Sequence, residues 1–335
     1  MKKTYYLFNP GRLSRKDNTL KFTPVDEDGV EGTPKYIPVE GVSDFFCFGS
    51  LDANSALYNF LGKAGIAVHF FDYYEHYTGS FAPKEYLLAG KMQIEQTKSY
   101  IDKKKRLVIA KKFIQGAAFN MTKNLRYYIN REKDLTPILE VVEEYAKLID
   151  GATAIDELMG VEGNIRQTYY KAFDGIISGD FQMDNRSKRP PENEINALIS
   201  FGNMLCYTLC LSQIYHTQLN PTISFLHEPG YRRYSLALDV AEIFKPLLVD
   251  RLIFRLLNKK EIQVKDFDHQ VNSCLLKESG RKTFVRAWEE RINETFKHPV
   301  LKRHVSYKHL VKLECYKLTK HILAMEEYKP FKSRW

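Results

Sequence analysis

Apolar residues along the first quarter of the chain occur in short runs separated by turn residues. The runs are rich in aromatic and β-branched residues: YYLF at 5–8, LKFTPV at 20–25, PKYIPV at 34–39, DFFCFG at 44–49 and IAVHFFDYY at 66–74. Pairs such as Pro10-Gly11 and Asp28-Gly29 mark turns between them. Only 52–64 has helical spacing in this region. The pattern predicts a small β-domain over residues 1–88.

From Gly90 onward, apolar residues recur at the spacing of one helix face. The predicted helices cover 91–130, 135–149, 153–177, a segment opened by Pro190 and Pro191 and reaching about 214, 236–258 with Pro246 inside it, 280–296 and 300–325. The last ten residues are expected to be frayed. The expected fold class is α+β, with the small β-domain followed by a larger all-α domain over residues 89–335.

The charge balance of the chain points to its partner class. The net charge is +9 and the pI is about 9.0, which favours a polyanion, although solubility alone also explains such a charge. Five scattered cysteines without a CxxC motif suit a reducing cytoplasm, and the i, i+4 pair Cys206 and Cys210 reads as buried thiols. Neither a signal sequence nor a stretch of eighteen apolar residues is found, so no membrane span is expected.

Candidate chemistry gathers in the stretch 224–245. Asp239 and Glu242 lie three residues apart, which places them on one face of a helix, and His227 precedes them in a loop. Glu162 lies inside an apolar helical stripe, where a carboxylate is costly to bury unless it is paired or bound to a cation. On spacing alone, a hydrogen-bonded loop histidine is the commoner explanation of His227, and a solvent-exposed helix face that of Asp239 and Glu242. Glu162 could equally lie at the margin of its stripe and reach water. If the four do form a site, one imidazole and three carboxylates suit Mg²⁺ or Mn²⁺, and a basic chain suggests a phosphodiester substrate.

Three motifs resemble a known family. They are E-G-N at 162–164, N-R-S-K-R-P-P at 185–191 and S-L-A-L-D-V-A-E at 235–242. In order and approximate spacing they are similar to those of the CRISPR-associated spacer-acquisition integrases, which are metal-dependent DNA endonucleases. The resemblance extends to the architecture, a β-domain followed by a helical domain.

The resemblance implies a set of site residues. The metal ligands would be Glu162, His227 and Glu242, with Asp239 as a further acidic residue of the catalytic site. The last ligand is Asp in many members of the family and Glu here. We further expect the basic residues nearest the site in sequence to hold DNA phosphates: Arg186, Lys188, Arg189, Arg232 and Arg233.

The resemblance also implies an activity and an assembly. The activity would be transfer of prespacer 3′-OH ends into the CRISPR repeat, with cleavage of branched DNA at the same centre. The β-domains would join a homodimer, and two dimers would flank a small ferredoxin-like partner protein in a hetero-hexamer on double-stranded DNA. A general metal-dependent repair nuclease and a catalytically silent DNA-binding scaffold are the alternatives.

Overall fold

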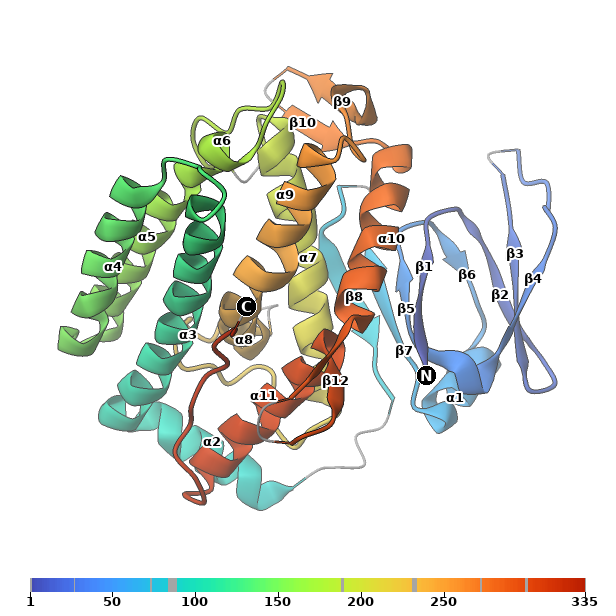
Figure 1. The fold of residues 1–335 in the computed structure, drawn as a ribbon. Coiled ribbons are helices and arrows are strands. Elements are labelled where there is room, and N and C mark those ends of the chain that lie inside the picture. The colour runs from blue at the N-terminus through green and yellow to red at the C-terminus, as the bar shows by residue number, and fades with distance from the viewer. Residues whose placement is uncertain are drawn as a thin grey trace. The chain divides into compact units, whose positions relative to one another are not determined.

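The computed structural model describes residues 2–26, 28–72, 74–83, 89–187, 190–230, 234–271, 273–298 and 301–334. The chain divides into two compact units, Met1–Leu88 and Ala89–Trp335. The first consists mainly of strands and the second mainly of helices (Figure 1). The predicted α+β fold class is confirmed.

The described part of the first unit contains two four-stranded sheets, one α-helix and the short 3-10 helix η1 (Val39–Gly41). The strands are β1 (Lys3–Leu7), β2 (Gly11–Lys16), β3 (Thr19–Pro24), β4 (Lys35–Pro38), β5 (Val42–Cys47), β6 (Leu51–Asp52), β7 (Ala67–Phe71) and β8 (Tyr77–Phe81). One sheet has the order β1-β5-β7-β8, with β1, β5 and β7 parallel, and the other has the order β4-β3-β2-β6. Both sheets share an apolar core that includes Leu13, Leu20, Phe45 and Val68.

The helix of this unit begins later than its apolar spacing predicted. Leu51 and Asp52 pair with strand β2 as β6, so α1 covers Ser55–Ala64 only. Asn54 caps the helix, because its side-chain oxygen accepts a hydrogen bond from the Leu57 amide at 3.0 Å. All five predicted strand runs contain a strand, but β2, β6 and β8 were missed because their apolar content is low.

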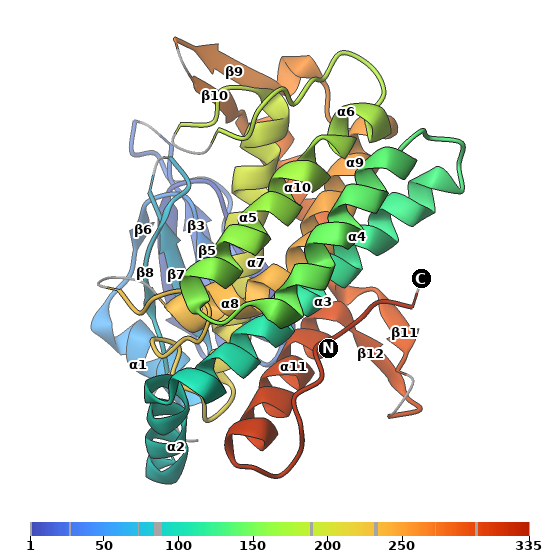
Figure 2. The ribbon, with the colours of Figure 1, turned by 90° about the vertical axis from the view of Figure 1, so that its left-hand side faces the viewer.

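The second unit is a bundle of helices with two short hairpins. Its elements are α2 (Gly90–Ile101), α3 (Lys103–Ile129), α4 (Thr136–Gly151), α5 (Ile155–Tyr170), α6 (Ala172–Ile176), α7 (Glu194–Tyr215), α8 (Ser235–Lys245), the π-helical turn η2 (Pro246–Asp250), α9 (Arg251–Asn258), β9 (Phe267–Gln270), β10 (Ser273–Leu276), α10 (Glu278–Asn293), β11 (Thr295–Lys297), β12 (His304–Ser306) and α11 (Tyr307–Ile322). Figures 1 and 2 show α3, α4 and α5 side by side, with α8 next to α3 and α7.

Helix α7 runs through the interior of this unit. It is the one helix in the described ranges that is long and apolar enough to cross a membrane, but 78% of its most apolar window is buried within the fold. Burial on nearly all sides explains its apolar composition, as expected of a core helix. All five cysteines are free and buried, including Cys206 and Cys210 on α7.

The segment 91–130 forms two helices rather than the one predicted. Asp102 ends α2 and caps α3, since its carboxylate accepts hydrogen bonds from the amides of Lys104 and Lys105 at 3.0 and 3.1 Å. Three apolar residues of the segment, Ile94, Ile101 and Val108, are exposed.

Other predicted helices are shortened by caps and turns. Residues 153–177 break at Lys171 between α5 and α6. Pro190 and Pro191 precede α7 instead of starting it, because Asn193 provides the cap and accepts the Asn196 amide at 2.9 Å. Residues 300–325 begin with strand β12, and α11 starts only after Ser306.

The expectation of a frayed C-terminal tail is wrong. The Tyr328 hydroxyl and the Phe331 amide both donate to the buried Glu314 carboxylate, at 2.7 and 3.0 Å. The Ser333 amide donates to Asn120 on α3 at 2.9 Å. The aromatic ring of Phe331 stacks on that of Phe244 in α8. Polar capture of the tail backbone and burial of its aromatic side chains therefore fix it against the helices.

Candidate metal centre

Helix α8 places its two acidic residues in the interior. The whole residue is 0% exposed for Asp239 and 5% exposed for Glu242. The i, i+3 spacing puts them on one face, as predicted, but this face is turned inward and not to solvent. A buried carboxylate needs partners, so the contacts of each one define its role.

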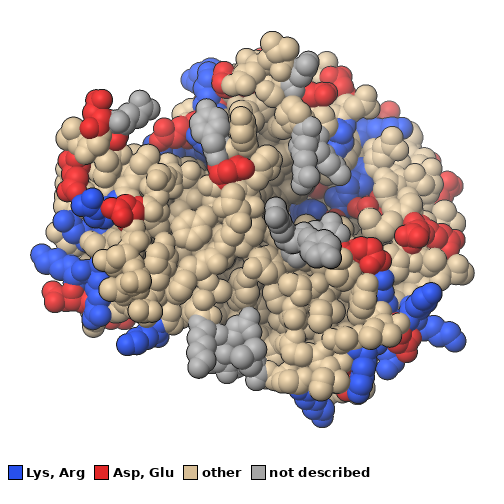
Figure 3. Space-filling model, turned by 180° about the vertical axis from the view of Figure 1, so that it is seen from behind, with Lys and Arg blue, Asp and Glu red and all other residues tan. Residues whose placement is uncertain are grey.

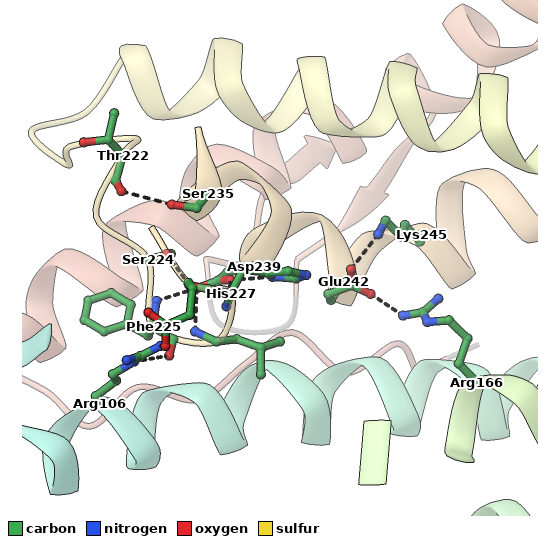
Figure 4. A network of polar contacts seen from close by, with 12 residues as sticks. Arg106, Arg166, Thr222, Ser224, Phe225, His227, Ser235, Asp239, Glu242 and Lys245 are labelled. Carbon is green, nitrogen blue, oxygen red and sulfur yellow. Dashed lines mark hydrogen bonds and ion pairs between the residues drawn. The ribbon is translucent and has the colours of Figure 1, made fainter. Parts of the chain in front are cut away.

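Asp239 binds the loop that carries His227. One carboxylate oxygen accepts the amides of Phe225 and Leu226 at 2.6 and 2.9 Å, and the other accepts the amide of His227 at 2.9 Å. The His227 ring nitrogen Nδ1 lies 2.8 Å from the same second oxygen (Figure 4). A carboxylate accepts hydrogen bonds, so this contact assigns the proton to Nδ1 and leaves Nε2 as the nitrogen for a metal.

The loop around His227 is held from both ends. Ser224 Oγ donates to the carbonyl oxygen of His227 at 2.5 Å. From α3, Arg106 Nε donates to the Phe225 carbonyl at 2.8 Å, and its Nη2 pairs with Glu228 at 2.6 Å. The backbone of this loop is therefore fixed by side chains on two helices and on the loop itself.

The carboxylates of Glu162 on α5 and Glu242 on α8 meet at one guanidinium. Arg166 Nε lies 2.6 Å from Glu162 Oε1, and its Nη2 pairs with Glu242 Oε2. The second oxygen of Glu242 pairs with Lys245 Nζ at 2.5 Å (Figure 4). The side chains of Glu162, Arg166 and Glu242 are only 16%, 15% and 7% exposed. The ion pair with Arg166 explains how the Glu162 carboxylate is accommodated inside the apolar stripe.

Neighbouring charges shift the pKa values of this cluster. Burial raises the pKa of Glu242, but the charges of Arg166 and Lys245 outweigh burial and lower it to about 2. Burial lowers the pKa of His227, whereas the hydrogen bond and charge of Asp239 and the charge of Glu242 raise it; the net direction is upward. Glu242 is thus ionised at neutral pH.

The donor set fits a hard divalent cation. Glu162 and Glu242 both pair with Arg166. The charge of Glu242 raises the pKa of His227, and the charge of His227 lowers the pKa of Glu242. Asp239 supplies the outer hydrogen bond that metal-binding histidines usually have. Across the described ranges, however, no three His, Cys, Asp or Glu side chains lie close enough to form a ready metal cage. Arg166 and Lys245 take up the carboxylate oxygens instead.

The residues expected to hold DNA are placed only in part. Arg186 is half-buried, and its guanidinium donates to the Ser187 carbonyl, to Asn196 Oδ1 at 2.9 Å and to Ser200 Oγ at 3.1 Å. Burial lowers its pKa. It therefore holds its own loop to α7. Lys188, Arg189, Arg232 and Arg233 lie outside the described residues.

Pro246 directly follows α8, next to the site. Pro246 has no amide hydrogen to donate, and the helix widens into the π-helical turn η2. Asp250 ends this turn with a carboxyl group that is 2% exposed and whose Oδ2 has no partner among the described residues. Burial raises the pKa of Asp250 to about 7, against the opposing effects of Arg166 and Tyr169.

Sequence reasoning missed the cations of the site. Arg166 follows Glu162 by four residues and Lys245 follows Glu242 by three, which are the spacings of helical ion pairs. That signal was available. No such signal marked Asn124 on α3, whose amide nitrogen donates to the Tyr169 hydroxyl at 2.9 Å and to the Pro246 carbonyl at 2.8 Å.

Comparison with known proteins identifies the family. Residues 5–290 match the family model described as CRISPR associated protein Cas1. A relative from Thermodesulfovibrio yellowstonii, named CRISPR-associated endonuclease Cas1 3, is 46% identical over 99% of this chain and 100% of its own length. The structure of a Cas1 protein from Thermotoga maritima is 39% identical over 97% of this chain and 98% of that one, with a TM-score of 0.85.

Two more distant structures share the fold. A casposase bound to integration product is 20% identical, with a TM-score of 0.87 over 100% of this chain and 94% of that one. A chain of a Cas6-RT-Cas1–Cas2 complex is 17% identical, with a TM-score of 0.83 over 100% of this chain and 36% of that one. The family match and the 46% identity to a named relative over 99% of the chain show that the chain belongs to the CRISPR-associated Cas1 family.

Proposed function

We propose that this chain is a CRISPR spacer-acquisition integrase and endonuclease. The observation that carries the proposal is the meeting of Glu162 and Glu242 at Arg166, with the charge of His227 acting on Glu242. Glu162 on α5 lies 65 residues before His227 in the sequence, whereas His227 lies in the loop that precedes α8, the helix of Glu242. The endonuclease names of full-length relatives agree with it.

Glu162, His227 and Glu242 would hold Mg²⁺ or Mn²⁺, since carboxylate oxygens suit these ions. The bound ion would stabilise charge on the phosphoryl group during displacement by a 3′-hydroxyl or by water. Asp239 keeps the Nδ1 proton of His227 in place and so directs Nε2 to the ion. Arg106 and Ser224 fix the loop backbone, which limits the directions that the imidazole can take.

The proposed reaction is transfer of a prespacer 3′-OH end into the CRISPR repeat, with cleavage of branched DNA at the same centre. The proposed assembly is a homodimer through the N-terminal unit that binds a small ferredoxin-like partner in a hetero-hexamer on duplex DNA. The fold shared with a chain of a Cas1–Cas2 complex supports a partner of this kind. We infer that the assembly works in the cytoplasm.

A joining assay tests the proposal. The purified protein, with and without the partner, is incubated with a 3′-OH duplex and a supercoiled target carrying a CRISPR repeat, in Mg²⁺ or Mn²⁺. Joined product is expected from the unmodified protein and none from Glu162→Ala or His227→Ala. Normal joining by either variant contradicts the assignment of the site. Hydrolysis of branched DNA without any joined product supports a repair nuclease instead.

A further inference from the structure

Arg166 takes up the carboxylate oxygens that a metal ion would need. Its guanidinium contacts Oε1 of Glu162 and Oε2 of Glu242, so both acidic side chains point at the same cation. A divalent ion bound by Glu162 and Glu242 has to take oxygens of these same two carboxylates. Pairing with Arg166 and binding of metal therefore compete.

Arg166 cannot stop competing with the metal ion by losing its proton. A guanidinium stays charged at any pH at which proteins are folded. Its side chain is also 15% exposed, so water compensates poorly for a lost carboxylate partner. A guanidinium pushed away from the two glutamates consequently needs another anion nearby.

The charge of the cluster shows which anion that is. Without metal, the two carboxylates are balanced by Arg166 and Lys245. A divalent ion added to this set, with the Asp239 carboxylate counted and His227 neutral, gives a surplus of one positive charge. That surplus, together with the five N–H donors of a guanidinium, matches the phosphodiester group of DNA.

We propose that Arg166 is a resident counter-cation of the metal site, which a divalent ion displaces from Glu162 and Glu242 onto a DNA phosphate. Metal and DNA then favour each other's binding. The phosphate binds the guanidinium that the metal ion displaces, and the metal ion binds the carboxylates that Arg166 leaves. The inference rests on the proposed function, since it takes Glu162 and Glu242 as metal ligands.

The test is a Mn²⁺ titration of full-length protein, followed by electron paramagnetic resonance or calorimetry, with and without a DNA duplex. Without DNA, Arg166→Gln is expected to bind Mn²⁺ at least about fivefold tighter than the unmodified protein, because the competing cation is gone. With DNA, the unmodified protein should gain Mn²⁺ affinity and Arg166→Gln should gain much less.

Two further variants make the result decisive. Arg166→Lys keeps the charge but lacks the planar fork of the guanidinium, so it should hold the two carboxylates less firmly and its Mn²⁺ affinity should lie between the other two. Arg166→Lys replaces Arg166→Gln if the glutamine variant does not fold. Lys63→Gln removes an exposed cation of α1 in the first unit, which forms no ion pair within the described ranges, and should leave Mn²⁺ affinity unchanged.

The outcomes distinguish a failure of the counter-cation role from a failure of the proposed metal site. Unchanged or weaker Mn²⁺ binding by both Arg166 variants overturns the counter-cation role and makes Arg166 a residue that positions the carboxylates. If the unmodified protein binds no Mn²⁺, or if Glu242→Ala binds Mn²⁺ equally well, the proposed metal site is wrong. The inference is then wrong as well.

Discussion

Asp239 illustrates how a single residue can position other residues of the proposed site. Its two oxygens are occupied by three loop amides and the imidazole of His227. The sequence alone could not separate this role from that of Glu242, because both are acidic residues on one face of α8. Only the contacts show that Asp239 faces the loop and that Glu242 faces α5.

Asp239→Asn should weaken metal binding without abolishing it. An amide cannot accept all the hydrogen bonds of the carboxylate, and it carries no charge to hold the Nδ1 proton of His227. Loss of such an outer contact typically reduces metal affinity about 10- to 100-fold. A Mn²⁺ titration measures the effect. The control is Ser235→Ala, on the same helix as Asp239, which removes the hydrogen bond from Ser235 Oγ to the Thr222 carbonyl oxygen. An affinity equal to that of the unmodified protein would show that His227 needs no such orientation.

Asp250 predicts a pH dependence of stability. Its pKa in the folded protein, about 7, lies above the ordinary value of 3.8. Between these values the folded state keeps a proton that the unfolded state releases, so this group lowers the free energy of unfolding as pH rises from about 4 to about 7. Above pH 7 the full cost of the buried charge is present.

Asp250→Asn removes that cost. In denaturant titrations with a chelator present, the variant should be more stable than the unmodified protein at pH 8 by a few kcal/mol, since one pKa unit corresponds to about 1.4 kcal/mol. The difference should shrink as pH falls toward 4. A constant difference between pH 4 and pH 8 would mean that Asp250 does not titrate in this range.

At the scale of the elements, α3 connects the two helices that carry the carboxylates. Asn124 donates to Tyr169 on α5 and to the Pro246 carbonyl after α8, and accepts from Arg251 Nε at 2.6 Å. Four residues earlier on the same helix, Asn120 donates to the Ile243 carbonyl at 3.0 Å and to the Phe331 carbonyl of the tail at 3.3 Å. Two buried amides thus fix the end of α8 beside Glu242.

Asn124→Asp should disturb this spacing while keeping the side chain's shape. Aspartate still accepts from Arg251, but it loses the donors to Tyr169 and Pro246. We expect a loss of about 1–3 kcal/mol in the free energy of unfolding and about tenfold weaker Mn²⁺ binding. The matched variant is Asn196→Asp, which loses a buried amide contact to Asn185 in another loop and should lower stability only. Equal Mn²⁺ affinities of the two variants would refute a role for Asn124 in spacing the helices.

Element boundaries were the least predictable part of the fold. Periodicity located most helices, but their ends depend on single side chains such as Asp102, Asn193 and Ser306, which accept backbone hydrogen bonds. The tail was mispredicted for a related reason. Its polar composition suggested fraying, whereas the buried partners Glu314 and Asn120 lie 17 and 213 residues away from the tail residues they bind.

For the whole molecule, net charge is the property that concerns DNA. The chain carries +9, yet Lys and Arg are interspersed with Asp and Glu on the face that Figure 3 shows, rather than gathered in one patch. A basic pI therefore favours a polyanionic partner but does not indicate the contact surface. Individual lysines without carboxylate partners are better indicators.

Three such lysines line a groove between α3, α4 and the tail: Lys123, Lys147 and Lys332. They form no ion pair in the described parts of the chain, and the Nζ atoms of Lys123 and Lys332 lie 5.6 and 5.2 Å from the ring centroid of Phe119. Ammonium groups that lack a carboxylate are available to phosphates, and each phosphate contact adds about −0.9 to the slope of log affinity against log salt.

Replacing these three lysines by glutamine should therefore weaken duplex binding and make the salt slope less negative by up to about 3, since at most three phosphate contacts disappear. Mn²⁺ affinity measured without DNA should stay the same, because no contact between these lysines and Glu162, His227 or Glu242 is found among the described residues. Fluorescence anisotropy with a labelled duplex over a series of salt concentrations measures the slope. Lys98→Gln, which removes an exposed lysine already paired with Glu95, is the control and should change the slope little. An unchanged slope in the triple variant would place the DNA on another surface.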